Sequence, residues 1–160
     1  MKHAFLALVL LATALIVCKP CFGQDALAGN MIKGLKNLRS VAVIVRPNTP
    51  REIASLKEWG DMVEVGLRRN VPDLGRLDDA QKAGAWLELS VITTDAGGFL
   101  ELSLYRWVKV VDTGEEIFSK VWWDSRVVFG GISKRSLQDA LDALLTSFAA
   151  DYSRARRYSK

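Results

Sequence analysis

Residues 85–94, 99–111 and 116–128 have the sequences AWLELSVITT, FLELSLYRWVKVV and EIFSKVWWDSRVV, and these three segments decide the fold. In each of them, apolar residues recur at every second position, which is the period of a β-strand with one buried face. The tetrapeptide DAGG (95–98) separates the first two segments and DTG (112–114) separates the second two. Both are typical of tight turns, so the sequence predicts three consecutive antiparallel strands.

Alternate positions in these segments fall into two sets of different character. One set is almost wholly apolar and is expected to face the core of the protein. It consists of Leu87, Leu89, Val91, Leu100, Leu102, Leu104, Val108, Val110, Ile117, Val121 and Trp123. The other set carries the charges and is expected to form the outer face, although it is rich in rings. It includes Trp86, Phe99, Tyr105, Trp107, Phe118 and Trp122 beside Glu88, Glu101, Lys109 and Lys120.

Rings on the outer face of a sheet suggest a binding surface. In a small domain that face is normally polar, whereas rings interleaved with Glu and Lys are typical of a protein interface or a carbohydrate platform. The alternative interpretation is structural: the rings fill a curved sheet or lie under another segment, such as residues 24–39. The candidate binding residues are Trp86, Tyr105, Trp107, Phe118 and Trp122.

Two helices and a further strand are expected on either side of this region. Residues 40–46 contain a short, wholly apolar run, which predicts a strand covered on both faces. Thr49 and Glu52, with Pro50 between them, form a capping-box pattern that predicts the start of a helix. Its buried face is expected to hold Ile53, Leu56, Gly60, Val63 and Leu67. A last helix, capped by Ser133 or Ser136, is expected to bury Leu137, Leu141, Leu144, Phe148 and Tyr152.

The order of these elements is β-α-β-β-β-α. Two amphipathic helices and a mostly antiparallel sheet predict an α+β fold, a two-layer sandwich with both helices on one face of the sheet. The polar connector 71–82 has room for a very short edge strand. A single globular domain of residues 24–160 accounts for the whole pattern.

The N-terminal segment predicts export. Lys2 and His3 precede residues 4–17, which carry no charge, and Gly23 supplies a small residue at the cleavage position. We expect a signal peptide over residues 1–23 and a periplasmic or secreted protein. Two other interpretations stay open: a retained membrane anchor, although the apolar stretch is shorter than the roughly 20 residues of a spanning helix, and a lipidated cysteine at Cys18 or Cys21.

Removal of this segment would leave a chain without Cys or His, because His3, Cys18 and Cys21 all lie within it. Such a chain cannot form a disulfide, a catalytic centre that depends on Cys or His, or a zinc site with these ligands. No catalytic residue, metal ligand or cofactor is therefore predicted. Lys2 and Lys19 leave with the segment, so the net charge falls from +4 to +2, which argues against a nucleic acid partner.

The order of elements, with a Trp in the last strand and a closing helix that ends Phe148-Ala149-Ala150-Asp151-Tyr152, resembles small bacterial envelope proteins. The pattern is similar to that of the TolB N-terminal domain and of PelC-like lipoproteins, and the likeness covers most of the exported chain. The resemblance implies a bacterial periplasmic interaction module and assigns no residue roles.

The leading functional hypothesis is a non-catalytic exported domain that binds another protein, or itself, through the ring-rich face, with at most peripheral membrane contact. Two alternatives belong to other classes. A carboxylate-dependent hydrolase acting on envelope glycans needs two facing acids, and a carrier of a small ligand or lipid needs an enclosed apolar cavity. Asp78 and Asp79 are adjacent acids in a predicted loop, and a solvated loop is the preferred interpretation of the pair.

Overall fold

The computed structural model describes residues 29–48, 53–78, 82, 84–130 and 132–158. The predicted signal peptide and its cleavage position lie outside the described residues. By internal contacts, Met1–Asn30 and Met31–Lys160 are separate units, and all the labelled strands and helices belong to the second. They are β1 (Ser40–Asn48), α3 (Leu56–Asn70), β2 (Gly75–Arg76), β3 (Ala85–Thr93), β4 (Gly97–Lys109), β5 (Glu116–Phe129) and α5 (Lys134–Arg157).

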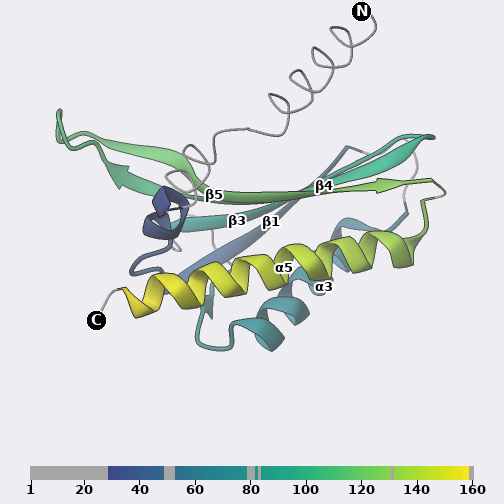
Figure 1. Ribbon diagram of the computed structural model, residues 1–160, viewed down its shortest axis with the longest axis horizontal. Helices are drawn as coiled ribbons and strands as arrows, with labels where there is room; N and C mark the ends of the chain where they lie inside the picture. Colours follow the sequence, from purple (N-terminus) through teal and green to yellow (C-terminus); the bar gives the residue numbers. More distant parts are fainter. Residues whose placement is uncertain (1–28, 49–52, 79–81, 83, 131, 159–160) are drawn as a thin grey trace, which may run out of the picture. The chain divides into compact units, whose positions relative to one another are not determined.

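The five strands form one mixed sheet in the order β2-β1-β3-β4-β5. β1 is parallel to both of its neighbours, whereas β3, β4 and β5 form an antiparallel meander. α3 and α5 lie on the same side of this sheet (Figure 1). The α+β two-layer fold with both helices on one face is therefore confirmed, and β2 is the very short edge strand for which the connector left room.

The core lies between the sheet and the two helices. Its strand residues include those at the inward positions of β3 and β4, such as Leu89 and Leu102, which are fully buried. The predicted stripe of α5 is confirmed, because all five of its residues are buried. Among the described residues, no helix is both long enough and apolar enough to cross a membrane.

The start of α3 differs from the prediction. The helix begins at Leu56, and Ser55 is its N-cap: the Ser55 hydroxyl accepts from the Glu58 backbone N–H, and the Glu58 carboxylate accepts from the Ser55 backbone N–H at 2.8 Å. Thr49 and Glu52 lie outside the described residues. Both segments, TPRE and SLKE, carry the capping-box pattern, and local pattern alone does not choose between them.

The later start also changes the buried face of α3. Trp59, Val63, Gly66 and Leu67 are buried, whereas Leu56 is 56% exposed, so the prediction for Leu56 is wrong. At Gly66 the two helices approach closely: a Cβ added there would overlap Leu145 Cδ1 of α5. Gly66 therefore allows α3 and α5 to pack against each other at this point.

Residues 31–38 lead into the sheet on its helix-covered side. Leu35 and Leu38 are buried in the core, and Met31 and Ile32 pack against it. Arg106 of β4 holds this segment, because its Nη1 donates to the backbone oxygens of Gly34 at 3.1 Å and Lys36 at 2.8 Å. The described part of the 24–39 segment thus contributes to the core.

Candidate binding surface

A β-bulge in β5 decides which rings reach the outer face of the sheet. Leu104 pairs with Trp122, but its neighbour Tyr105 pairs with Lys120, so Val121 is an extra residue in β5. The alternation of the strand reverses at this residue. Phe118 and Lys120 keep their outward positions, whereas everything from Trp122 onward exchanges faces.

The placement of Trp122 on the outer face was therefore wrong. Its side chain is fully buried, its ring lies 5.1 Å from that of Phe148, and its Nε1 donates to Asp151 Oδ2 at 3.1 Å. Trp123, expected in the core, instead pairs with Ser103, a residue of the outer face. The sequence Val121-Trp122-Trp123 offers no signal for the bulge, because apolar residues occupy both faces there.

The other four candidates come together on the outer face. Phe118 of β5 is their centre: its ring centroid lies 4.5 Å from that of Trp86, 5.4 Å from that of Trp107 and 6.1 Å from that of Tyr105. Trp86 belongs to β3 and Phe118 to β5, so their side chains meet over the intervening strand β4. We refer to Trp86, Tyr105, Trp107 and Phe118 as the aromatic cluster.

Exposure differs within the aromatic cluster. Trp86, Tyr105 and Phe118 are half-buried, whereas Trp107 is 56% exposed. The ring of Trp107 stands edge-on to Phe118 at an interplanar angle of 66°. Edge-to-face packing of this kind stabilises the cluster from within. The same arrangement leaves the Trp107 side chain facing solvent at the edge of the aromatic cluster.

A charged group lies beside the aromatic cluster. Glu101 Oε1 accepts from Lys120 Nζ at 2.6 Å and from Ser103 Oγ at 2.7 Å. Lys120 Nζ also lies 5.6 Å from the centre of the Tyr105 ring, a cation–π distance. The ion pair is thus fixed in place by the same strands that carry the rings.

The electrostatics of this pair follow from its partial burial. Burial alone would raise the pKa of Glu101, but the hydrogen bonds from Lys120 and Ser103 outweigh it and hold the pKa below its usual value. Burial likewise would lower the pKa of Lys120, but Glu101, and then Tyr105, keep it above its usual value. Both groups are therefore charged at neutral pH.

A second ion pair lies further along the same face. Glu88 of β3 accepts from Arg46 Nε of β1 at 2.9 Å. Arg46 is largely exposed, whereas Glu88 is mostly covered, with a side-chain exposure of 12%. The outer face therefore presents rings at one end and fixed charges of both signs along its middle.

Apolar residues also reach the surface at the far end of this face. Beyond the bulge, Val127 pairs with Phe99 and Phe129 with Gly97, and Val127 and Phe129 are 54% and 84% exposed. Sequence reasoning missed both as outward residues, because it carried the alternation of β5 through Val121 without a break.

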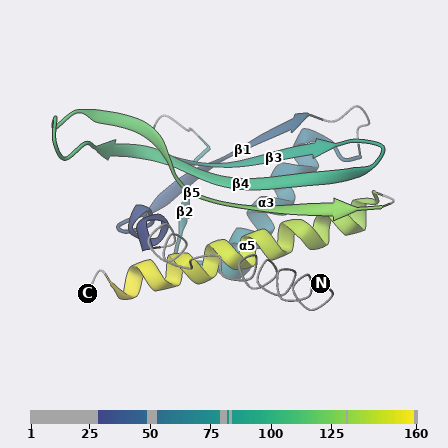
Figure 2. The same cartoon turned by 45° about the horizontal axis from the view of Figure 1, so that its top comes forward.

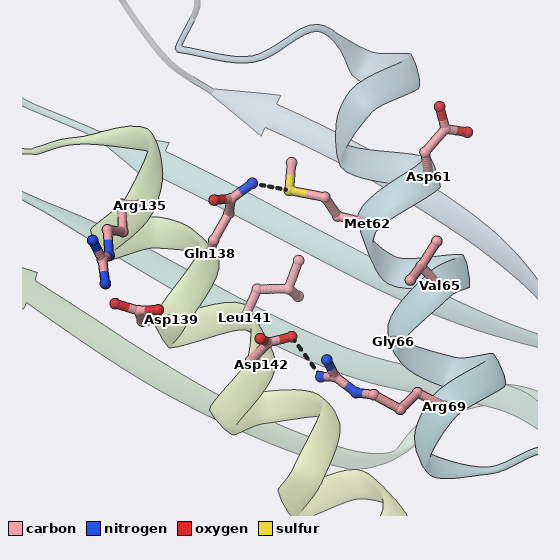
Figure 3. A pocket seen from close by; sticks show the side chains of 10 residues that line it. All are labelled: Asp61, Met62, Val65, Gly66, Arg69, Arg135, Gln138, Asp139, Leu141 and Asp142. Carbon is pink, nitrogen blue, oxygen red and sulfur yellow. Dashed lines mark hydrogen bonds and ion pairs between the residues drawn. The ribbon is translucent and has the colours of Figure 1, made fainter.

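A groove of about 540 Å³ lies between α3 and α5 (Figure 3). Met62, Gly66 and Leu141 contribute apolar surface, while Asp61, Arg69, Arg135, Gln138, Asp139 and Asp142 bring polar groups. Asp142 is engaged by Arg69 at 3.0 Å, and Asp61 points away from Asp139 and Asp142. The hydrolase hypothesis needs two facing carboxylates, and these three acids do not face one another.

Metal ligands do not cluster in the described part of the chain: no group of three or more His, Cys, Asp or Glu residues there is placed to hold an ion. Asp78 is described, but Asp79 is not, so the pair itself lies partly outside the described residues.

No protein-family model matches the sequence, and no curated protein matches it. Among solved structures, PelC from Paraburkholderia phytofirmans, described as a dodecamer, has a TM-score of 0.39 and 16% identity over 71% of this chain and 87% of that chain. The LpoB C-terminal domain from Salmonella enterica has a TM-score of 0.41 and 14% identity over 65% and 98%. A lipoprotein from Neisseria meningitidis has a TM-score of 0.30 and 13% identity over 70% and 98%.

Similar solved structures thus include bacterial envelope proteins. The expected resemblance to PelC-like lipoproteins is confirmed as a weak one. At these identities and TM-scores, the similarity tells nothing about what this chain binds. The functional argument therefore rests on the residues of the chain itself.

Proposed function

We propose that this protein is an exported, non-catalytic interaction domain that binds another protein, or a second copy of itself, through the aromatic cluster. The observation that carries the proposal is the position of Trp107. It is a large ring on an outer sheet face, it is 56% exposed, and Phe118, which itself contacts Trp86 and Tyr105, packs against it. A supported but uncovered tryptophan is the kind of residue that dominates the energetics of protein interfaces.

The gain from covering this ring is substantial. A tryptophan side chain buries roughly 150–250 Å² when enclosed, so covering the exposed half would remove about 100 Å² from water. At about 25 cal/mol per Å², this is worth about 2–3 kcal/mol. Because the Phe118 ring already packs against Trp107, the Trp107 side chain would lose little conformational entropy when a partner covers it.

The neighbouring charges favour specific binding over non-specific hydrophobic association. Glu101, Lys120, Glu88 and Arg46 present both signs at fixed positions along the same face. A partner with complementary charges would be oriented by them, and a partner with the wrong charges would be repelled. An apolar anchor beside a charged, ordered surface is the usual arrangement of a transient protein interface.

The test is Trp107→Ala in the exported protein, measured by sedimentation equilibrium and by recovery of bound proteins from envelope extract. We expect weaker self-association or the loss of a specific partner, with an unchanged circular dichroism spectrum. Phe129→Ala is the matched control, since Phe129 is also an exposed ring on the outer face but lies outside the aromatic cluster. Equal behaviour of the two variants, or no effect of either, would remove the aromatic cluster as the binding site.

A further inference from the structure

The two ends of the described chain meet in a strongly basic region. Residues 31–39 and 154–158 contain six basic residues, Lys33, Lys36, Arg39, Arg154, Arg156 and Arg157, and no acidic one. The two segments are in contact, because Lys36 Nζ donates to the Tyr158 backbone oxygen at 3.2 Å; just before the second segment, Tyr152 Oη donates to the Leu38 backbone oxygen at 3.2 Å. Figures 1 and 2 both show residues 31–38 beside the C-terminal end of α5.

Most of these charges have no acidic partner among the residues that the structure describes. Arg154 pairs with Asp151 at 3.4 Å and Arg156 with Asp73 at 2.6 Å. Within the described part of the chain, the other four cations have no acidic partner. We call these four residues, together with Tyr158, the basic surface: Lys33, Lys36, Arg39, Arg157 and Tyr158.

We infer that the basic surface docks on an anionic phospholipid bilayer. The chain that follows the predicted signal peptide has a net charge of only +2, so four neighbouring cations that no described acid pairs with mark a local concentration of charge. Each Lys or Arg near an anionic membrane contributes roughly a fivefold gain in partitioning. Tyr158 is 72% exposed among these cations, and tyrosine is enriched at the level of lipid headgroups.

The course of the chain favours a membrane over a soluble polyanion. The uncharged residues 4–17 are joined to this region through residues 18–30. Even fully extended, those linking residues span at most about 45 Å. Before cleavage after Gly23, insertion of the apolar segment in the bilayer would therefore keep residue 31, where the second unit begins, within about that distance of the headgroups. A soluble polyanion has no such covalent connection to the chain.

Co-sedimentation of the exported protein with vesicles tests the inference. We expect binding to vesicles of phosphatidylglycerol and phosphatidylcholine in equal parts, little binding to pure phosphatidylcholine, and weaker binding as salt is added. Arg39→Gln combined with Arg157→Gln should weaken binding roughly 25-fold, from two losses of about fivefold each. Both side chains are exposed, so circular dichroism should show the variant folded.

A matched control removes the same charge at the opposite end of α5. Lys57→Gln with Arg135→Gln changes two exposed cations near the N-termini of α3 and α5, which the Lys134–Glu58 ion pair holds together. Position 135 lies about 33 Å along the helix from position 157. This control should bind vesicles as the unmodified protein does. Equal loss in both double variants would mean that net charge alone is responsible and would overturn the inference.

Two further outcomes discriminate the source of the anion and the site. Binding to dextran sulfate without binding to the anionic vesicles would overturn the membrane assignment in favour of a soluble polyanion. Trp107→Ala should leave vesicle binding unchanged, because the aromatic cluster is a different surface. Loss of vesicle binding in that variant would contradict the basic surface as the docking site. The binding role of the aromatic cluster is tested separately, by the effect of Trp107→Ala on self-association or partner binding.

Discussion

The indole of Trp122 lies edge-on to the ring of Phe148, with the two centroids 5.1 Å apart, and its Nε1 donates a hydrogen bond to Asp151. This contact joins the edge strand β5 to α5 across the core. Trp122 therefore stabilises the fold. Trp107 lies on the opposite face of the neighbouring strand β4, where its exposed ring is available to contact a partner.

The two tryptophans should separate cleanly in urea unfolding. Trp122→Ala is expected to cost about 3–5 kcal/mol, because it leaves a cavity beside Phe148. Trp107→Ala should cost less than about 1 kcal/mol, since more than half of that side chain is already in water. Similar large losses in both variants would show that Trp107 is covered in solution, and the structural interpretation of the rings would then hold.

The closely packed glycine in α3 gives a matched pair of substitutions. Gly66→Ala should destabilise the protein by about 1–3 kcal/mol, because the new methyl group overlaps the Leu145 side chain. Gly60→Ala in the same helix meets nothing within 4 Å and should be neutral or stabilising by up to about 1 kcal/mol. Thermal unfolding of both variants checks the prediction, and an equal effect would contradict the close approach of α3 to α5.

The N-terminus of α3 can be located by cap substitutions. Ser55→Ala should cost about 1 kcal/mol, since the hydroxyl accepts from the Glu58 backbone N–H. Ser55→Thr should cost much less because it keeps that acceptor. Thr49→Ala serves as the comparison: a larger loss there than at Ser55, measured by chemical denaturation, would place the start of the helix at the earlier capping pattern.

Glu58 should titrate far below an ordinary glutamate. The hydrogen bond from Lys134, followed by that from the Ser55 backbone N–H, lowers its pKa from 4.5 to about 2. A pKa depressed by folding contributes stability above the unfolded pKa, and this contribution is lost as the pH falls toward about 2. NMR titration of the Glu58 carboxyl checks the value. Lys134→Met should raise it, whereas Lys57→Met, whose partner is Asp61, should not; the reverse result would contradict the ion pair between α3 and α5.

Much of the fold follows from local patterns. The alternation in residues 85–128 and the Asp112-Thr113-Gly114 turn predict the meander, because one buried face imposes a period of two. The stripe of α5 is equally regular, from Leu137 to Tyr152. These elements are predictable because the spacing of apolar residues within each one shows which of its faces is buried.

The bulge and the start of α3 are not predictable in this way. Val121 is β-branched and apolar, so nothing in its type marks it as the extra residue of a strand. The close packing of Gly34 against Val121, where an added Cβ would lie 2.8 Å from the Val121 oxygen, is a long-range contact that no local pattern records. Four of the five candidate rings were placed correctly because they precede the bulge or lie on other strands; Trp122 follows it.

The adjacent tryptophans of β5 have a consequence for how the strand tolerates insertions and deletions. With Val121 as the extra residue, Trp122 enters the core and Trp123 faces outward. Deletion of Val121 would remove the bulge and leave Trp122 opposite Leu104 in the core, whereas a shift of the bulge to the far side of Trp123 would exchange the two indoles, and in both cases each face would receive one tryptophan. At this level of the sheet either tryptophan can supply the buried indole, so neither the loss of Val121 nor a shift of the bulge would empty the core.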